Sequence, residues 1–235
     1  MAKSAQPTEK KVSRRDAFRA QKQAQQHRTR LIWIVVATIV ALVLAAILII
    51  PNLPVSPENV KVPTPRERTM VDGTSVGDPN APVKVIEFSD FNCIHCRNFW
   101  ESSESDLYEK YIATGKVHFS YVTMSFISPT SFTAAEAAYC AMDQGMFWEY
   151  HDYIFANFGV DFTSPLLKAI AQEAGLDMSA FNNCFNSNKY QLRVQQDLKD
   201  AQDQGINSTP TFVVNGEKTD SGNLFAVIEK QLGEN

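Results

Sequence analysis

The chain has 235 residues, of which 44% are hydrophobic and 20% charged, enough for one sizeable globular domain and an appendage but too few for two large domains. Its formal net charge of -4 is unevenly spread, because residues 1–30 are strongly basic and the rest of the chain is acidic. An acidic folded part repels phosphate groups, which excludes nucleic acid as its expected partner.

Residues 31–50 form an apolar run whose only polar member is Thr38. A helix of this length spans about 30 Å, the thickness of the hydrocarbon core of a bilayer. A helix buried in a soluble core is seldom apolar on every face. A cleavable signal peptide should have a shorter apolar region and an A-x-A-like cleavage site, which is missing before the proline-rich stretch. We therefore favour an uncleaved transmembrane signal anchor over a cleaved signal peptide.

Residues 1–30 carry the Lys and Arg side chains that resist translocation, so the N-terminus is expected in the cytoplasm. We interpret this segment as a basic tail that is either mobile or helical at the membrane interface. The predicted localisation is the cell membrane, crossed once, with the folded domain outside the cytoplasm or in the periplasm. All four cysteines then lie where stable disulfides are permitted.

The segment 51–68 is rich in proline, with five prolines between Pro51 and Pro65. Such a composition favours an extended, moderately stiff spacer that holds the following domain away from the bilayer. The folded domain is expected over residues 69–235.

The first half of the domain has a strand–helix–strand pattern. Residues 83–89 are β-rich and largely apolar, a helix is expected from Cys93 to about residue 113, and residues 116–124 alternate as a second strand. A connection of this length predicts a βαβ unit with parallel strands and a right-handed crossover. An α/β core follows.

The second half begins with a helical pattern over about 128–205, which fits roughly four helices. Strand character returns at residues 211–214 and 217–219, joined by an Asn-Gly turn, and an amphipathic helix over 223–232 closes the domain.

Cys93 and Cys96 are three residues apart, where the first strand turns into a helix. The first sulfur faces the free N–H groups of the helix start, which stabilise a thiolate. Cys93 is therefore the expected nucleophile and Cys96 the resolving thiol. His95 lies between them and favours the thiolate when it is protonated or donates a hydrogen bond.

Two other interpretations of the Cys93 and Cys96 pair are a plain structural disulfide and half of a zinc site. Zinc needs two more ligands, and the sequence has no second C-x-x-C or H-x-H cluster. The pattern for covalent haem attachment fails because position 97 is Arg.

The stretch 85–96, VIEFSDFNCIHC, resembles the active-site strand and helix of the DsbA-like branch of the thioredoxin superfamily. The stretch 205–216, GINSTPTFVVNG, is similar to the cis-proline loop and following strand of that family, and the resemblance covers roughly residues 76–232. It implies a thioredoxin fold (βαβ…ββα) with an inserted helical domain, preceded here by one transmembrane helix. It also implies a protein-disulfide oxidoreductase that uses a redox-active disulfide and neither cofactor nor metal.

The same resemblance implies roles for three further residues. Pro210 should be cis and lie against Cys93, and the backbone of Thr209 should pair with the substrate chain. The alternative is an ordinary trans turn proline. Glu87 should be a buried base for the proton of Cys96, with its pKa raised by burial, unless it is an edge residue that reaches water.

Two positions depart from the family pattern and leave the redox direction open. Ile94 stands where strong oxidants of the family often have Pro, and Thr209 where they often have Val. The leading prediction is disulfide donation to unfolded exported proteins, with a quinone-linked membrane thiol oxidase restoring the disulfide. A reductase or isomerase of the same fold, and a non-catalytic membrane-anchored peptide-binding module, are the alternatives.

Cys140 and Cys184 lie in the helical block without a C-x-x-C context. Because unpaired thiols are a liability outside the cell, a structural disulfide between Cys140 and Cys184 is predicted. The alternative interpretations are two buried free thiols or a second site of thiol-disulfide exchange. The aromatic residues within 146–155 recur at helical spacing and are expected in the core, and His151 is interpreted as structural or exposed.

Overall fold

The computed structural model describes residues 14–50, 53 and 55–233, which divide into two units between residues 51 and 52. The described part of the first unit is a helix, α1 (Arg14–Ile49), 36 residues long. Its stretch Gln21–Ile49 is long and apolar enough to cross a membrane, and its apolar side chains are exposed. This is the property that a lipid-facing helix requires.

The expected boundary at residue 30 is not a structural one. α1 begins at Arg14 and continues without a break from the basic segment into the apolar one. Residues 14–30 are rich in Ala, Gln and Arg, which are good helix formers, so the polar segment extends the apolar helix. The expectation for residues 1–13 lies outside the described residues.

The second unit contains a mixed five-stranded sheet and the helices around it. The strands are β1 (Ser75–Val76), β2 (Val83–Ser89), β3 (Val117–Thr123), β4 (Thr211–Val214) and β5 (Glu217–Thr219). The helical elements are η2 (Pro57–Asn59), α2 (Ile94–Ser102), α3 (Glu104–Leu107), η3 (Tyr108–Ile112), α4 (Pro129–Met142), α5 (Phe147–Ala156), α6 (Ser164–Glu173), α7 (Met178–Asn186), α8 (Gln191–Asp203) and α9 (Leu224–Leu232).

The strand order in the sheet is β1-β3-β2-β4-β5. β2 and β3 pair in parallel, from Val83 opposite Val117 to Ser89 opposite Thr123, while every other neighbouring pair is antiparallel. β2 is therefore a central strand, and the dithiol segment that follows it starts from the rigid middle of the sheet. The short edge strand β1 has no counterpart in the sequence prediction, since two residues carry too little pattern to recognise.

The helix predicted from Cys93 to about residue 113 is interrupted. α2 ends at Ser102, and α3 and the π-helical turn η3 follow after Ser103. The Ser102 hydroxyl donates to the carbonyl of Asn98 at 2.7 Å, and serine side chains that bond to the local backbone commonly bend helices. The break turns the buried carboxylate of Glu104 towards the interior.

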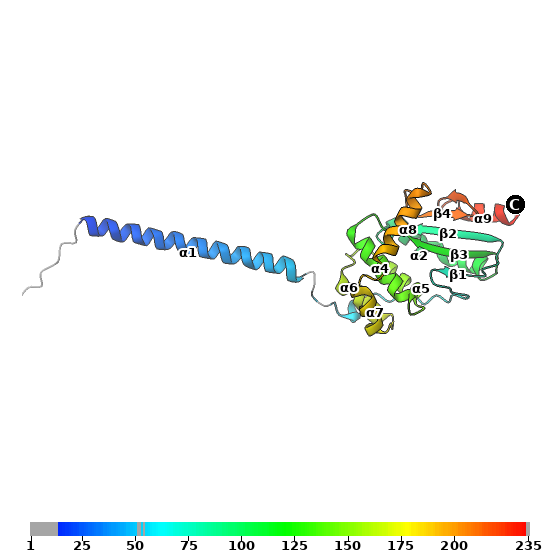
Figure 1. The fold of residues 1–235 in the computed structure, drawn as a ribbon, viewed down its shortest axis with the longest axis horizontal. Helices are drawn as coiled ribbons and strands as arrows, with labels where there is room; N and C mark the ends of the chain where they lie inside the picture. The colour runs from blue at the N-terminus through cyan, green and yellow to red at the C-terminus, as the bar shows by residue number, and fades with distance from the viewer. Residues whose placement is uncertain (1–13, 51–52, 54, 234–235) are drawn as a thin grey trace, which may run out of the picture. The chain divides into compact units, whose positions relative to one another are not determined.

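Five helices, α4 to α8, occupy the block between β3 and β4, one more than the sequence indicated. Figure 1 shows α4, α6 and α7 grouped to one side of the sheet. A disulfide joins Cys140 of α4 to Cys184 of α7 across 44 residues of sequence. Gly145 and Gly175 follow α4 and α6 with φ values of 72° and 84°, the left-handed conformation that ends helices.

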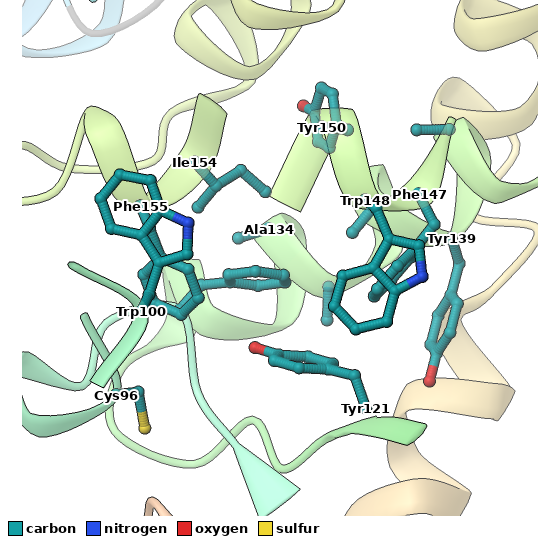
Figure 2. Packing of buried hydrophobic residues seen from close by; sticks show 14 of the residues in the cluster. Cys96, Trp100, Tyr121, Ala134, Tyr139, Phe147, Trp148, Tyr150, Ile154 and Phe155 are labelled. Carbon is teal, nitrogen blue, oxygen red and sulfur yellow. The ribbon is translucent and has the colours of Figure 1, made fainter. Parts of the chain in front are cut away.

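An aromatic core connects the helical block to the sheet (Figure 2). Trp148, His151 and Phe155 of α5 make ring contacts with Tyr121 of β3 or with Phe91, the residue that leads into the dithiol segment. His151 is fully buried within this cluster, in accord with a structural role. The core therefore packs directly beneath the residues that precede Cys93.

The proline-rich segment is a shorter spacer than predicted. The sequence predicts a spacer over residues 51–68, yet Val60 is buried and the Lys61 backbone exchanges two hydrogen bonds, of 2.8 and 2.9 Å, with the side chain of Asn157. Arg68 is buried in ion pairs with Glu104 and Asp152. We call residues 55–68 the packed strap. Proline content predicts an extended backbone correctly, but an extended backbone can still pack on a domain through its other side chains.

Candidate active site

Cys93 is the N-cap of α2, the position at which a helix has free backbone N–H groups. Its Sγ accepts a hydrogen bond from the backbone N–H of Cys96 at 3.4 Å. Cys93 and Cys96 are both free thiols in this structure, and Cys93 is the more accessible, with 5% of its surface exposed against 0% for Cys96. The accessible sulfur is the one that the helix start stabilises as an anion.

The surroundings of Cys93 lower its pKa to about 6. The largest cause is the hydrogen bond from the thiol of Cys96, and burial works against it. The side chain of Thr209 and the backbone N–H groups of Cys96 and His95 lower the pKa further. At neutral pH Cys93 is therefore mainly a thiolate, the form that attacks disulfides.

The reactivity of Cys93 should follow this titration. In the reduced full-length protein in detergent, the rate of Cys93 alkylation by iodoacetamide should level off above pH 7 and fall about tenfold between pH 7 and pH 5. Because the pKa in the folded state is below that of an unfolded thiol, the thiolate stabilises the reduced fold fully above the unfolded pKa. That contribution is lost as pH falls through about 6. A rate that still rises tenfold per unit between pH 7 and pH 8 would contradict this environment.

Cys96 and Glu87 lie in the interior behind Cys93. Burial raises the pKa of Cys96 well above its ordinary value, and the bond to Cys93 and the charge of Glu87 add to this effect. Burial likewise raises the pKa of Glu87, with contributions from the negative charges of Glu104 and Cys93. Glu87 is 2% exposed on the central strand β2, so it is not an edge residue that reaches water. A buried carboxyl group with a raised pKa next to a buried thiol is suited to exchange a proton with it.

The loop before β4 brings the cis peptide bond Thr209–Pro210 to Cys93. The Sγ of Cys93 lies 3.3 Å from the carbonyl oxygen of Thr209, to which the thiol form donates. Thr209 and Pro210 are partly exposed, so the backbone beside the sulfur is open to an extended chain.

The structure places His95 differently from the sequence interpretation. The imidazole is exposed, and among the described residues it has no hydrogen bond to Cys93; the contribution of His95 to the thiolate comes from its backbone N–H. The neighbouring Arg97 forms an ion pair with Glu101 at 2.5 Å, one helical turn further along α2. Direct action of the His95 ring on Cys93 stays a prediction.

Sequence reasoning missed two residues that hold the site in place. Asp90 is buried at the end of β2, and its Oδ2 accepts hydrogen bonds from the backbone N–H groups of Phe126 and Ile127 at 2.9 and 3.0 Å. The Asn92 amide donates to hydroxyl groups at the start of α4, including that of Ser128 at 3.0 Å. Asp90 and Asn92 lie close to the dithiol in the sequence, and this closeness could have identified them as residues of the site. Their hydrogen-bond partners, however, lie more than 30 residues away in the sequence.

One described group of side chains has the composition of a metal site. Ligand atoms of Glu104, His151 and Asp152 lie within 4.8 Å of one another. Arg68 donates to both carboxylates, at 2.5 Å to Glu104 and at 2.8 and 2.9 Å to Asp152. A guanidinium group already supplies the positive charge there, so we assign this group as an ion-pair network.

The thiolate at the start of α2 has a buried second thiol behind it and a cis-proline beside it, and the buried acid lies on the adjoining strand β2. This arrangement on a mixed sheet defines a thiol-disulfide exchange protein of thioredoxin type. Comparison with known proteins agrees. The family model described as Thioredoxin matches residues 69–233. A protein from Bacillus anthracis named "Probable disulfide bond formation protein D" is 33% identical over 169 residues, which cover 67% of this chain and 77% of that protein.

Solved structures give the same result. The crystal structure of oxidised BdbD from Bacillus subtilis has a TM-score of 0.63 at 23% identity and covers 74% of this chain and all of that one (100%). The alpha-DsbA1 structure from Wolbachia pipientis has a TM-score of 0.60 at 26% identity, covering 77% of this chain and 97% of that one. The chain belongs to the DsbA-like family of the thioredoxin superfamily and is a protein-disulfide oxidoreductase. The predictions of family, fold class and enzyme class are thereby confirmed.

Proposed function

We propose that this protein donates the disulfide Cys93–Cys96 to unfolded exported proteins through a mixed disulfide at Cys93. The observation that carries the proposal is the environment of Cys93, whose pKa of about 6 makes it mainly a thiolate at neutral pH. Whatever stabilises the thiolate stabilises the reduced dithiol, and a stable reduced form drives the oxidised form to oxidise other thiols. The partly exposed Thr209–Pro210 backbone beside the sulfur supplies a pairing edge for an extended substrate.

The reaction proceeds in two exchanges. A substrate thiolate attacks the Sγ of Cys93, the Cys93–Cys96 bond breaks, and Cys96 leaves with the electron pair and takes a proton from Glu87. A second thiolate of the same substrate then attacks the first substrate sulfur, which is bound to Cys93. The substrate disulfide forms and Cys93 leaves as a thiolate, so the substrate is oxidised by two electrons and the dithiol is reduced by two. The redox group is the disulfide itself, and the proposal includes neither cofactor nor metal.

Location and reoxidation belong to the same proposal. The stretch Gln21–Ile49 has the length and composition of a membrane span, and the basic residues before the apolar run favour a cytoplasmic N-terminus. The catalytic domain then lies outside the cytoplasm, where a disulfide between Cys140 and Cys184 is stable. A quinone-linked thiol oxidase in the same membrane would accept the two electrons from the reduced Cys93–Cys96 pair.

Reduction or isomerisation is the second candidate function, because Thr209 stands where strong oxidants of the family often have Val. The side chain of Thr209 lowers the pKa of Cys93, which favours the oxidising direction instead. The reduction potential separates the two, since a reductase requires a value near that of thioredoxin, about -270 mV.

The donation step is tested with the oxidised full-length protein in detergent and a reduced, unfolded protein that forms one disulfide. The wild type should oxidise it, and Cys93→Ser should lower the rate to the background with the oxidised protein omitted. The double variant Cys140→Ser, Cys184→Ser serves as the matched control and should keep the wild-type rate if it folds. Undiminished oxidation by Cys93→Ser would reject the assignment of Cys93.

A further inference from the structure

Two buried hydroxyl groups near Cys96 have no hydrogen-bond partner within the described part of the chain. They belong to Ser89 on β2 and Tyr121 on β3, whose exposed fractions are 0% and 1%. Leaving a buried hydroxyl without a partner costs about 1–3 kcal/mol, so two such groups side by side call for an explanation. The exchange reaction proposed above does not use either of them.

The sheet register places these hydroxyls next to the proton acceptor. Tyr121 stands opposite Glu87 in the parallel pairing of β2 and β3. Ser89 follows Glu87 by two residues on the same strand, so its side chain lies on the same face of the sheet. Figure 2 shows the hydroxyl end of Tyr121 turned to the side on which Cys96 lies.

Ser89 is a polar neighbour that Glu87, Cys96 and Tyr121 share. Burial raises the pKa of Glu87, of Cys96 and of Tyr121, and in each case the side chain of Ser89 acts in the opposite direction. One hydroxyl therefore lies near enough to a carboxyl group, a thiol and a phenol to affect all three, although it forms no hydrogen bond with them in this conformation. A serine hydroxyl donates one hydrogen bond and accepts two, so it can accept from the thiol while it donates to the carboxylate.

We propose that the Ser89 hydroxyl relays the proton between Cys96 and Glu87 during thiol-disulfide exchange, and that the Tyr121 hydroxyl positions Ser89 for this transfer. This inference rests on the proposed function, in which Cys96 forms and breaks its bond to Cys93. Because the Ser89 hydroxyl has no fixed partner, it is free to turn between the thiol and the carboxyl group as the proton moves.

Cys96 resolves a mixed disulfide by displacing the bound thiol from Cys93. The Cys96 sulfur bonds to the sulfur of Cys93, the bond between Cys93 and the bound thiol breaks, and that thiol leaves with the electron pair as a thiolate. The proton of Cys96 passes to the Ser89 oxygen while the Ser89 proton passes to the Glu87 carboxylate. Disulfide donation runs the same transfer in reverse, and the protonated Glu87 then supplies the proton to departing Cys96.

The relay is tested by stopped flow with the reduced full-length protein in detergent and dithiobis(nitrobenzoate). Attack by Cys93 releases the first nitrothiobenzoate, and attack by Cys96 on the mixed disulfide releases the second. In Ser89→Ala the first release should stay within about twofold of the wild type and the second should slow about tenfold, a modest loss for assisted proton transfer. In Tyr121→Phe the second release should slow about threefold.

The pH profile separates a relay from a packing defect. The second release in the wild type should level off once Glu87 is ionised. In Ser89→Ala it should keep rising with hydroxide concentration, because Cys96 then loses its proton to solvent. Ser125→Ala removes another buried hydroxyl, which donates to the Ser131 carbonyl at 3.2 Å, and should leave both releases unchanged.

Failure of the proposed function and failure of the relay give different results in this experiment. Absence of the first release in the wild type would overturn the proposed function itself. With both releases intact in the wild type, an unchanged second release and pH profile in Ser89→Ala would overturn only the relay. Equal slowing of both releases in Ser89→Ala would also overturn it, since a general loss of packing affects Cys93 and Cys96 together.

Discussion

Replacing Cys96 with serine is expected to leave the protein covalently bound to its substrate. The reduced Cys96→Ser variant still has the Cys93 thiolate at the start of α2, which attacks a disulfide and releases one thiolate. Resolution by an adjacent thiol is an intramolecular reaction, and such reactions have effective concentrations far above those of thiols in solution. The lifetime of the mixed disulfide should therefore increase on the order of 10³-fold or more.

The adduct is measured by mass spectrometry after the full-length variant in detergent is mixed with a protein that contains one disulfide. It should disappear on addition of a small dithiol, which identifies the link as a disulfide. The double variant Cys93→Ser, Cys96→Ser is the control and should form no adduct. If the adduct of Cys96→Ser resolved at the wild-type rate, a group other than Cys96 would have to be the resolving nucleophile.

Loss of Arg68 should have the largest effect on stability. Its guanidinium group and the carboxylates of Glu104 and Asp152 are all buried, with side-chain exposures of 6%, 6% and 5%. Trp100 donates to the same Asp152 carboxylate at 2.8 Å. Burial alone would raise the pKa of Asp152, yet bonds from His151 and Arg68 lower it, so the carboxylate is ionised.

Arg68→Met retains the apolar length of the side chain but removes the arginine from the buried Asp152 carboxylate and leaves Glu104 with only its 3.4 Å contact to Arg66. Breaking a buried ion pair in this way costs about 3–5 kcal/mol, so the denaturation midpoint of the catalytic domain should fall clearly. Arg97→Met is the matched control, because Arg97 pairs with Glu101 on the surface, with exposures of 30% and 54%. That pair should contribute at most about 1 kcal/mol.

The Arg68 measurement also decides whether the packed strap belongs to the folded domain. A spacer residue in solvent would tolerate methionine with little change in the denaturation midpoint, which is also the result expected of the control. Equal midpoints for Arg68→Met and the wild type would mean that residues 55–68 do not pack on the domain in solution. Urea unfolding of the full-length protein in detergent, followed by tryptophan fluorescence, reports the change because Trp100 and Trp148 contact this network.

Local patterns predicted much of what the structure shows. The C-x-x-C spacing after an apolar strand placed Cys93 at a helix start, and the Asn-Gly turn placed the hairpin at residues 211–219, because both depend on neighbours in the sequence. Other features depend on distant residues. The packed strap and the anchoring of the 126–127 backbone by Asp90 each require a partner more than 30 residues away.

By itself the sequence determined the apolar span, the strand that leads to the dithiol and the position of Cys93 at a helix start, since those follow from period, length and spacing. Only the tertiary structure decided that Arg68 is buried and that Ser89 and Tyr121 share one interior with Cys96. The physical reason is that burial is a property of what packs against a side chain. The energies of charges and hydroxyls change most when water is removed by residues far away in the sequence.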